Sequence, residues 1–203
     1  MGNSRTLGPR SPKNFAPNCL FFIDMSRQLS YHDLRPRDFS EELADVNARR
    51  HPLALLFDGV ADARNIGALF RLADAANVSR VFLYREPDFQ INQKMVRVSR
   101  STIEYVPFTV VKDENHLKEI LSEYSPIVLD YTDRSTAYTK FSYPPNPLLV
   151  IGNEQRGTSD ELLELVADHI HLPMLGVKTS MNVACAASIA VYHVLYVTSL
   201  PEL

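Results

Sequence analysis

The chain has little of what stabilises a secreted or membrane-spanning protein. Only two of its 203 residues are cysteines, Cys19 and Cys185, and they lie far apart. Because Cys185 sits among alanines, a buried free thiol is favoured there over a disulfide or a metal ligand. The longest apolar stretch, 183–197, is shorter than the ~20 residues that a bilayer requires. We therefore expect no membrane segment, and a reducing, cytoplasmic location.

The chain also lacks a strong excess of charge of either sign. Its formal net charge is −3, and its 45% hydrophobic and 22% charged residues are ordinary for a globular domain. The total conceals an asymmetry, because residues 1–100 hold 15 Lys/Arg against 11 Asp/Glu, whereas residues 101–203 hold 6 against 13. Any nucleic acid should therefore meet the N-terminal half.

Apolar runs alternate with helical periodicity over most of the chain. Residues 1–50 are predicted to form a tail with a short charged helix at 36–50, and residues 51–203 a single α/β domain. Strands that are almost uniformly apolar favour a parallel sheet covered on both faces. The expected strands are 53–57, 80–84, 104–111, 127–131, 148–151 and 170–172. The expected helices are 65–76, 115–124, 159–166 and 182–198.

The first polar segment runs from Asp58 to Arg71, through a strand-to-helix loop and into the next helix. The apolar spacing that begins at Ile66 sets the core side of this helix. Arg71 lies about 140° around the helix from Ile66 and so points away from the core. Taken alone, the segment is explained by Asn65 as a helix cap and by a surface pair between Arg71 and Asp74.

The second polar segment, 152–157, follows an apolar strand and reads Gly-Asn-Glu-Gln-Arg-Gly. A phosphate-binding P-loop needs a lysine after its second glycine, and this chain has Thr158 there. A turn bounded by glycines, with Thr158 or Ser159 as the cap of the next helix, explains the glycines. That interpretation leaves Glu154 without a role.

The third polar segment leads from Pro173 through Ser180, Met181 and Asn182 into an apolar helix. Pro173 ends a strand because it cannot donate to the ladder, and Ser180 or Asn182 could simply cap the helix. A helix that is apolar on nearly all sides has to be buried, and a partner subunit is a natural cover. Polar loops at the ends of neighbouring strands are where open α/β sheets bind ligands, so these segments indicate an active site.

In order and context, the three segments resemble the motifs of the SpoU, or TrmH-type, branch of the SPOUT superfamily. These proteins are RNA ribose 2′-O-methyltransferases that use S-adenosylmethionine. The matching stretches are 65–71, 152–157 and 180–184, and three ordered motifs are more specific than any one of them. The resemblance implies a parallel-sheet SPOUT fold with a deep C-terminal trefoil knot. It also implies a homodimer that packs through the knot and the C-terminal helix.

The resemblance further implies roles for residues of this chain, with S-adenosylmethionine as cofactor and tRNA or rRNA as partner. The implied cofactor contacts are Gly152, Leu172, Met181, Leu129, Met174 and Gly176. The implied catalytic residues are Arg71, Asn65, Glu154, Ser180 and Asn182. Because arginine is effectively always protonated, we expect Arg71 to bind phosphate and stabilise the developing alkoxide, which leaves the final proton acceptor open. In such dimers the arginine can come from the opposite subunit.

The other three catalytic positions have implied roles in orientation. Asn65 orients Arg71 or its loop, and Glu154 positions the guanidinium or the ribose. Ser180 and Asn182 hold the nucleotide or the catalytic loops.

RNA selection is expected to rest on basic residues of the N-terminal half, although such charge is often only a solvated surface. The candidates are Arg64, Arg71, Arg49 and Arg50, together with Arg35 and Arg37. One stretch departs from the family, since relatives often carry Ser-Arg-Gly-Ala where this chain has Ser-Arg-Ser-Thr at 99–102. His169 and His171 alternate along a strand without a third ligand at metal-like spacing, so no metal is expected.

Two other function classes stay open. One is a catalytically inactive knotted dimer that binds RNA, and the other is a flavodoxin-like domain that binds a small molecule. The joint presence of Arg71, Glu154 and Asn182 favours catalysis over the first. The second predicts phosphate binding at an early loop, and the seven glycines form no suitable cluster there.

Overall fold

The computed structural model describes residues 28, 38–86 and 88–198. Contacts divide the chain into units 1–39 and 40–203, and nearly all described residues belong to the second. The helix predicted at 36–50 is present as α2 (Phe39–Ala48). Cys19, Arg35 and Arg37 lie outside the described residues, as does most of the predicted tail.

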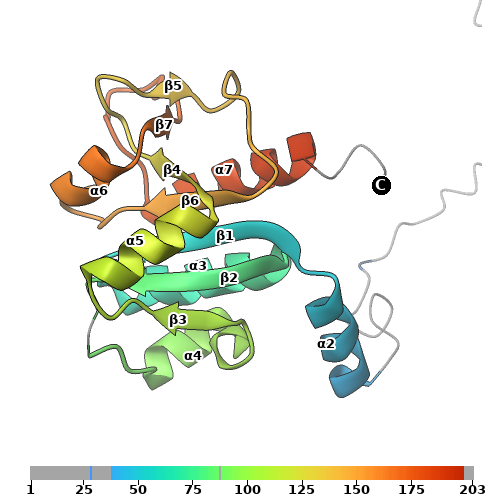
Figure 1. Cartoon of the computed structure of the whole chain (residues 1–203). Helices are drawn as coiled ribbons and strands as arrows, with labels where there is room; N and C mark the ends of the chain where they lie inside the picture. The colour runs from blue at the N-terminus through green and yellow to red at the C-terminus, as the bar shows by residue number, and fades with distance from the viewer. Residues whose placement is uncertain (1–27, 29–37, 87, 199–203) are drawn as a thin grey trace, which may run out of the picture. The chain divides into compact units, whose positions relative to one another are not determined.

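Seven parallel strands form one sheet in the described part of the chain (Figure 1). They are β1 (His51–Asp58), β2 (Val78–Tyr84), β3 (Phe108–Val110), β4 (Ser125–Leu129), β5 (Thr136–Ala137), β6 (Pro147–Ile151) and β7 (Asp168–His171). Their order is β3-β2-β1-β6-β4-β7-β5, so the chain runs outward from β1 to β3 and then crosses to the other side. All strand pairs are parallel, so the carboxyl ends of β1, β6 and β4 lie side by side where the order reverses, which is the usual ligand position.

Helices cover both faces of the sheet, as the sequence predicts. They are α3 (Ala63–Ala75), α4 (Gln93–Ser99), α5 (Glu114–Glu123), α6 (Asp160–Leu165) and α7 (Val183–Thr198), with the short 3-10 helix η1 (Thr102–Glu104). The helices α3, α4 and α7 contribute to one apolar core, and α5 and α6 contribute to the other. In Figure 1, α5 lies in front of the sheet and α3 behind it.

Alternation along β1 shows why the strands are apolar throughout. Leu53, Leu55 and Phe57 face the core of α3 and α7, whereas Ala54 and Leu56 face the core of α5 and α6. Successive side chains of a strand point to opposite faces, and both faces are covered here. Neither set of alternate positions along β1 faces water, so a polar side chain would be unfavourable at both.

Several boundaries differ from the prediction by one or two residues, as at β2, β4 and β7, and α3, β3 and β5 differ as well. The helix expected at 65–76 begins two residues earlier, because the Asp62 side chain accepts a hydrogen bond from Arg64 N at 2.7 Å and so caps α3. The strand expected at 104–111 is present only as β3 at 108–110, because η1 ends at Glu104 and an irregular turn follows it. The two-residue strand β5 was not predicted, because it contains no apolar run.

The last helix, α7, is covered on one side only within the chain. Its alanine-rich side faces the core, but Ile189, Tyr192 and Tyr196 are 42%, 48% and 66% exposed. The prediction of a buried thiol at Cys185 is wrong for the single chain, because Cys185 is exposed and free. Among the described residues, no helix combines the length and the apolar character needed to cross a bilayer.

Candidate active site

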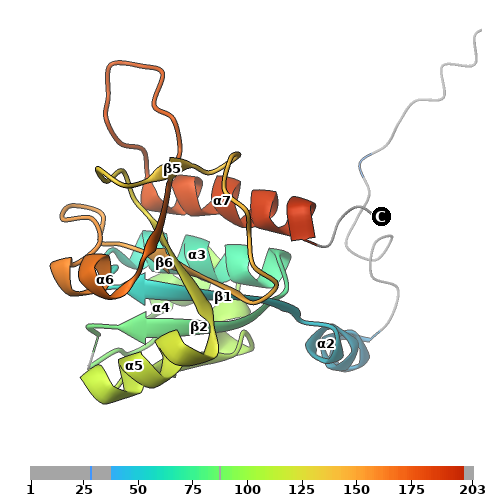
Figure 2. The ribbon, with the colours of Figure 1, turned by 45° about the horizontal axis from the view of Figure 1, so that its top comes forward.

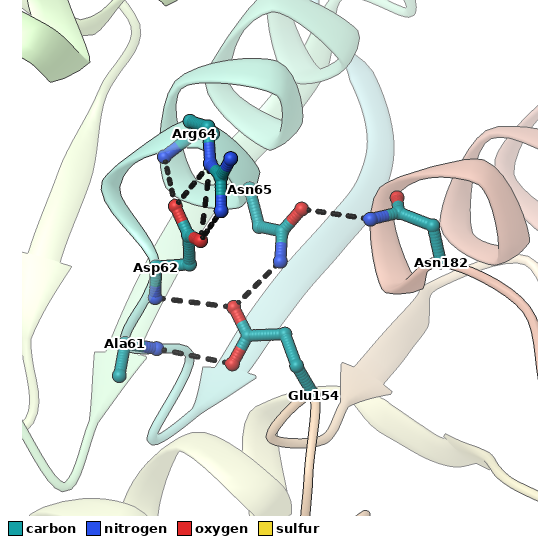
Figure 3. A network of polar contacts seen from close by, with 6 residues as sticks. All are labelled: Ala61, Asp62, Arg64, Asn65, Glu154 and Asn182. Atoms are coloured by element: carbon teal, nitrogen blue, oxygen red, sulfur yellow. Dashed lines mark hydrogen bonds and ion pairs between the residues drawn. The ribbon is translucent and has the colours of Figure 1, made fainter.

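One side chain from each polar segment meets in a hydrogen-bonded network (Figure 3). Asn65 on α3 donates from Nδ2 to Glu154 Oε1 at 2.8 Å, and Asn182 Nδ2 donates to Asn65 Oδ1 at 3.0 Å. Asn65 and Glu154 are 89 positions apart in the sequence, and Asn65 and Asn182 are 117 positions apart. Asn65 is therefore the link between the loop after β6 and the start of α7, and not the helix cap that its sequence position allows.

The Glu154 carboxylate also binds the backbone of the first loop. It accepts hydrogen bonds from Ala61 N at 3.3 Å and Asp62 N at 3.2 Å, in addition to the Asn65 amide. Asn153 strengthens the same junction by donating from Nδ2 to Gly59 O at 2.6 Å. Side chains of the second segment thus hold the loop of the first segment in place, which gives Glu154 a positioning role in the single chain.

The loop that carries Glu154 closes tightly on itself. Asn153 and Gly157 exchange backbone hydrogen bonds of 3.0 and 2.9 Å, which brings the far side of the loop against Gly152. A Cβ at Gly152 would lie 2.4 Å from both Gly157 C and Thr158 N, closer than any side chain tolerates. Gly152 is therefore needed for loop closure, whatever it contributes to ligand binding.

Two carboxylates that the sequence interpretation missed hold the end of this loop. Asp130 Oδ2 accepts from Thr158 N at 2.9 Å, and Asp58 Oδ2 accepts from Ser159 N at 2.7 Å. Each acid stands where a strand ends, Asp58 closing β1 and Asp130 following β4. That position is a signal which could have identified them, because the carboxyl ends of neighbouring parallel strands converge.

Asp58 lies deep in the protein, with only 2% of its surface exposed. Burial raises the pKa of its carboxyl above the ordinary value, and the Ser159 N–H opposes that rise. Its Oδ1 atom makes no hydrogen bond within the described residues, and neither do the buried hydroxyls of Thr158 and Ser159. Ser159 is the N-cap residue of α6, as predicted, but its side chain makes no capping hydrogen bond, and Asp58 binds its backbone N–H instead.

A cavity of about 370 Å³ opens on one side of the Glu154 loop. Five of the six predicted cofactor residues line it, and these are Leu129, Gly152, Leu172, Met174 and Met181. Gly176 does not line it, and its neighbours Leu175 and Val177 are 97% and 99% exposed on the loop that extends from β7 before α7 (Figure 2). Ser180 lies in the wall, so this cavity joins the second and third segments.

This cavity suits an amphipathic ligand that carries a positive charge. Its volume falls within the ~300–1,000 Å³ of small-molecule sites, and apolar side chains form part of its wall. Asp130 and Glu154 line it together with Arg156, so carboxylates outnumber guanidinium groups in its wall and attract a nearby cation. The residues present therefore fit S-adenosylmethionine, which combines an apolar methyl group, a nucleoside and a sulfonium charge.

A larger cavity of about 820 Å³ lies on the other side of the same loop. Asn65, Asp62 and the buried Asp58 line it, and it shares the stretch 153–157 with the smaller cavity. The Glu154 loop is therefore a wall between two spaces. One space is bordered by the predicted cofactor residues, and the other by the loop of the first segment.

Asn182 lines neither cavity, but it binds Asn65, which lines the larger one. Arg71 also lines neither cavity. It is exposed on α3, and within the described residues its side chain has no hydrogen bond or ion pair; the surface pair with Asp74 is not formed. Arg71 follows Asn65 by six positions, which places it about 9 Å further along the helix axis. One chain thus brings Asn65, Glu154 and Asn182 together and leaves Arg71 apart from them.

The other predicted RNA-binding arginines are already engaged. Arg64 Nη2 lies 2.6 Å from Asp62 Oδ2, and Arg49 Nη2 lies 3.6 Å from Asp45 Oδ2. Arg50 donates to Val78 O at 2.9 Å and also binds the side chain of Asn47. These contacts hold α2 and the start of α3.

The two histidines of β7 have hydrogen-bonding partners in the chain. His169 Nδ1 lies 2.9 Å from Thr132 Oγ1, and His171 Nδ1 lies 2.9 Å from Ser135 Oγ. The His171 ring also packs on Tyr131 with 4.3 Å between ring centroids, at the wall of the smaller cavity. Over the ranges 38–86 and 88–198, no group of three His, Cys, Asp or Glu side chains is placed to hold a metal ion.

The fold and the site define a parallel α/β protein with ligand cavities at the point where the strand order reverses. Residues 52–192 match the SpoU rRNA Methylase family, and the chain belongs to this family. The family resemblance stated from the three motifs is thereby confirmed.

Named relatives and solved structures agree with this family. A 23S rRNA (guanosine-2′-O-)-methyltransferase RlmB of Photorhabdus laumondii is 31% identical over 157 residues, which is 77% of this chain and 63% of that protein. The TrmH/SpoU tRNA modifying enzyme of A. aeolicus is 25% identical, with a TM-score of 0.65 over 80% of this chain and 90% of that one.

The SpoU methyltransferase AviRb from Streptomyces viridochromogenes, solved in complex with the cofactor AdoMet, shares the fold. Its sequence identity is 24%, with a TM-score of 0.66 over 76% of this chain and 63% of that one. These likenesses confirm the parallel SPOUT fold. The chain spans 56% to 64% of the length of the curated relatives that it matches.

Proposed function

We propose that this protein transfers a methyl group from S-adenosylmethionine to a ribose 2′-hydroxyl of tRNA or rRNA. The observation that carries the proposal is the junction at Asn65, where one residue of each family motif meets between two cavities. Bound S-adenosylmethionine supplies a methyl carbon whose bond to sulfur breaks as its bond to the ribose oxygen forms. The relatives named as ribose methyltransferases and the solved complex with AdoMet support this assignment.

In this proposal the smaller cavity holds the methyl donor. Leu129, Leu172 and Met181 enclose its apolar parts, and Asp130 in the cavity wall attracts its positive charge. Gly152 lets the loop approach closely, while Gly176 belongs to the exposed loop and would contact the donor only after that loop closes. The larger cavity receives the target nucleotide, because it adjoins the junction at Asn65 and carries Arg85 and Arg156 among its acidic residues.

The side chains around Asn65 act by orientation. Glu154 uses its oxygens to fix the first loop and the Asn65 amide, and Asn182 fixes the other end of that amide. Ser180 in the wall of the smaller cavity is free to contact the nucleotide. Holding the ribose oxygen in line with the methyl carbon is itself a large part of the rate enhancement in such transfers.

Arg71 completes the site from a second subunit in this proposal. Arginine stays protonated, so Arg71 binds a phosphate of the target and stabilises the developing alkoxide. In one chain it lies outside both cavities, and a twofold partner could supply it. The exposed stripe of α7, with Ile189, Tyr192 and Tyr196, offers an apolar surface for such a partner.

We also infer the deep trefoil knot that the family resemblance implies. Its support is the interleaving of the C-terminal strands, with β6 inserted between β1 and β4, and β7 placed beside β4. An experimental structure of the dimer tests the knot directly. A chain that straightens when its two ends are pulled would disprove it.

Calorimetric titration with S-adenosylmethionine, followed by labelled methyl transfer into unmodified tRNA and rRNA, tests the reaction. We expect donor binding and ribose-specific transfer to one of the two RNA pools. Absence of donor binding would exclude the enzyme. Donor binding without transfer to either pool would instead favour the inactive RNA-binding dimer.

Subunit mixing tests where Arg71 acts. Arg71→Ala and Glu154→Ala each disable one half of a shared site, so each homodimer should be inactive. If the arginine comes from the partner, the mixed dimer has one intact site, and an equal mixture should regain about a quarter of wild-type activity. If Arg71 acts within its own chain, no mixed site is intact and activity stays near zero.

A further inference from the structure

The surface at α4 carries a row of cations that line neither cavity of the site. Lys94 and Arg97 lie about one turn apart on α4, and Arg100 follows as the left-handed residue that ends the helix. All three are exposed, and none of their side chains forms a hydrogen bond or ion pair with any residue that the structure describes. We call this row the α4 ridge.

The α4 ridge lies next to the first loop of the site. The helices α3 and α4 pack with their backbones close together. A Cβ at Gly67 on α3 would lie 2.7 Å from Val98 Cβ and 3.0 Å from Met95 O on α4. Lys94 is near enough to Asp62 to help lower the pKa of that carboxyl, after the larger effect of Arg64. The ridge therefore begins beside the loop that Glu154 binds.

The exposed cations of α3 extend the same surface. At ~100° per residue, Arg64 lies about 60° and Arg71 about 40° from Gly67 around the helix, on the side where α4 packs. Arg64 and Arg71 thus border the contact between α3 and α4 from one helix, and the ridge borders it from the other. Positive charge is concentrated here although the whole chain has a net charge of −3.

The end of the α4 ridge is held in a fixed conformation. Arg100 and Ser101 both adopt left-handed backbone angles, with φ of 55° and 66°, although neither is glycine. Ser101 N donates to Val96 O at 3.0 Å, and the buried Thr102 hydroxyl donates to Ser99 O at 2.9 Å. Such strain persists only where surrounding contacts impose it, and it concentrates at functional sites.

A depression of about 490 Å³ lies at this turn, lined by Val96, Arg97, Arg100 and Ser101. Ser101 occupies this turn with a positive φ, a backbone conformation that glycine adopts at the least cost. The turn is thus kept without the residue that adopts it most easily.

We propose that Lys94, Arg97 and Arg100 form a phosphate-binding surface that holds the RNA backbone beside the target ribose. The inference rests on the proposed function, and it names the face of the protein along which the substrate strand runs. Unpaired exposed cations gain more from a phosphate strand than paired ones, because no existing ion pair has to be broken. The strand would pass from Arg100 along α4 to Arg64 and Arg71, and then into the larger cavity.

The test uses the full chain and replaces the ridge with neutral side chains of similar length, as Lys94→Gln, Arg97→Gln and Arg100→Gln together. The control variant carries Lys112→Gln, Lys118→Gln and Lys140→Gln, three exposed cations on or near α5 and β5. Both variants change the net charge equally. Circular dichroism and calorimetry with S-adenosylmethionine verify that each variant is folded and keeps its donor affinity.

Binding of unmodified bulk tRNA and of a 23S rRNA transcript is measured without donor, between 50 and 200 mM salt. For the ridge variant we expect affinity to fall roughly tenfold or more at the lower salt, and the slope of log affinity against log salt to flatten by about 2. The control variant should match the wild type. Equal losses in the two variants, or no loss in the ridge variant, would overturn the inference.

Wild-type results separate this inference from the proposed function. If the wild type binds RNA and methylates it while the ridge variant behaves like the control, the role of the α4 ridge in RNA binding is wrong. The proposed methyl-transfer reaction is then still supported. If the wild type neither binds the donor nor methylates RNA, the proposed function fails by itself.

Discussion

The helices α3 and α7 both reach the site through an asparagine, yet they differ in how much of their surface the chain itself covers. The apolar residues of α3 are buried, and its exposed side is polar and basic. In contrast, α7 buries its alanine side and exposes aromatic and branched side chains, such as Tyr192 and Ile189.

In the proposed function, α3 contributes to RNA recognition and α7 to assembly of the dimer. A polar exposed side, as on α3, is stable in water and available to a charged ligand. Exposing several large apolar residues to water is unfavourable, and such an exposed side is typical of an interface. The hydrogen bond between Asn65 and Asn182 joins the two helices, so we expect a change at the start of α7 to alter the position of Asn65.

The largest expected effect comes from the basic side of α3. Arg71→Ala should lower turnover by about 10²- to 10³-fold, because it removes a charge that stabilises the developing alkoxide. Its affinity for S-adenosylmethionine should be unchanged, since Arg71 does not line the smaller cavity. Single-turnover methyl transfer and calorimetry measure the two quantities. Normal turnover would contradict the role assigned to Arg71.

Breaking the apolar side of α7 should have a nearly equal effect on activity by a different route. Tyr192→Asp places a charge in the proposed interface, so we expect a monomer in sedimentation or light scattering and a loss of turnover of about 100-fold. Ala75→Asp puts the same charge on the exposed end of α3 as a control. A monomer with full activity would show that the site needs no partner.

The link between the two helices can be cut without removing a helix cap. Asn182 accepts hydrogen bonds from Ala184 N and Cys185 N at the start of α7, and it donates to Asn65. Asn182→Asp keeps the accepting oxygens and loses the donor, so stability should hold while turnover falls about tenfold. Asn182→Ala should lower both. Thermal unfolding and methyl transfer separate the two variants, and equal behaviour would contradict the link.

The smallest effect concerns the cap of α3. Hydrogen bonding from Arg64, in side chain and backbone, lowers the pKa of Asp62 to about 2. Because this pKa lies below the ordinary value, the stabilisation is present above pH 4 and is lost as pH falls toward 2. Asp62→Asn keeps a capping oxygen, so its unfolding temperature should fall less steeply than that of the wild type over this range.

The same variant sharpens the comparison of surfaces. Asp62→Asn removes the acid that pairs with Arg64, and we expect RNA affinity at low salt to rise a few-fold. A charge change on α7 should not reproduce this rise. Unchanged RNA affinity would show that Arg64 only stabilises its own helix.

Local patterns predicted most of the architecture. The apolar runs at β1, β4 and β6 and the periodicity of α3, α5 and α7 were identified because each element carries its own signal. Errors arose where that signal was weak or overridden. The strand β5 has two residues, and the start of α3 is set by an aspartate cap that outranks Asn65.

The site was predictable only in part for a related reason. Motif spacing identified Asn65, Glu154 and Asn182, but their mutual hydrogen bonds depend on which strand ends lie together. Asp58 and Asp130 were missed because neither belongs to a motif. Asp58 binds a backbone N–H 101 positions away in the sequence, and Asp130 binds one 28 positions away. Likewise, the α4 ridge becomes a surface only because α4 packs against Gly67.

By itself, the amino-acid sequence determined the α/β class, the family and the polar segments, because these depend on residue order and local periodicity. The tertiary structure alone decided that the Glu154 loop separates two cavities, that Arg71 stands outside both, and that one side of α7 is left uncovered. The physical reason is the strand order. Because β6 lies between β1 and β4, the ends of strands that are far apart in the sequence come together, and no local pattern can relate them.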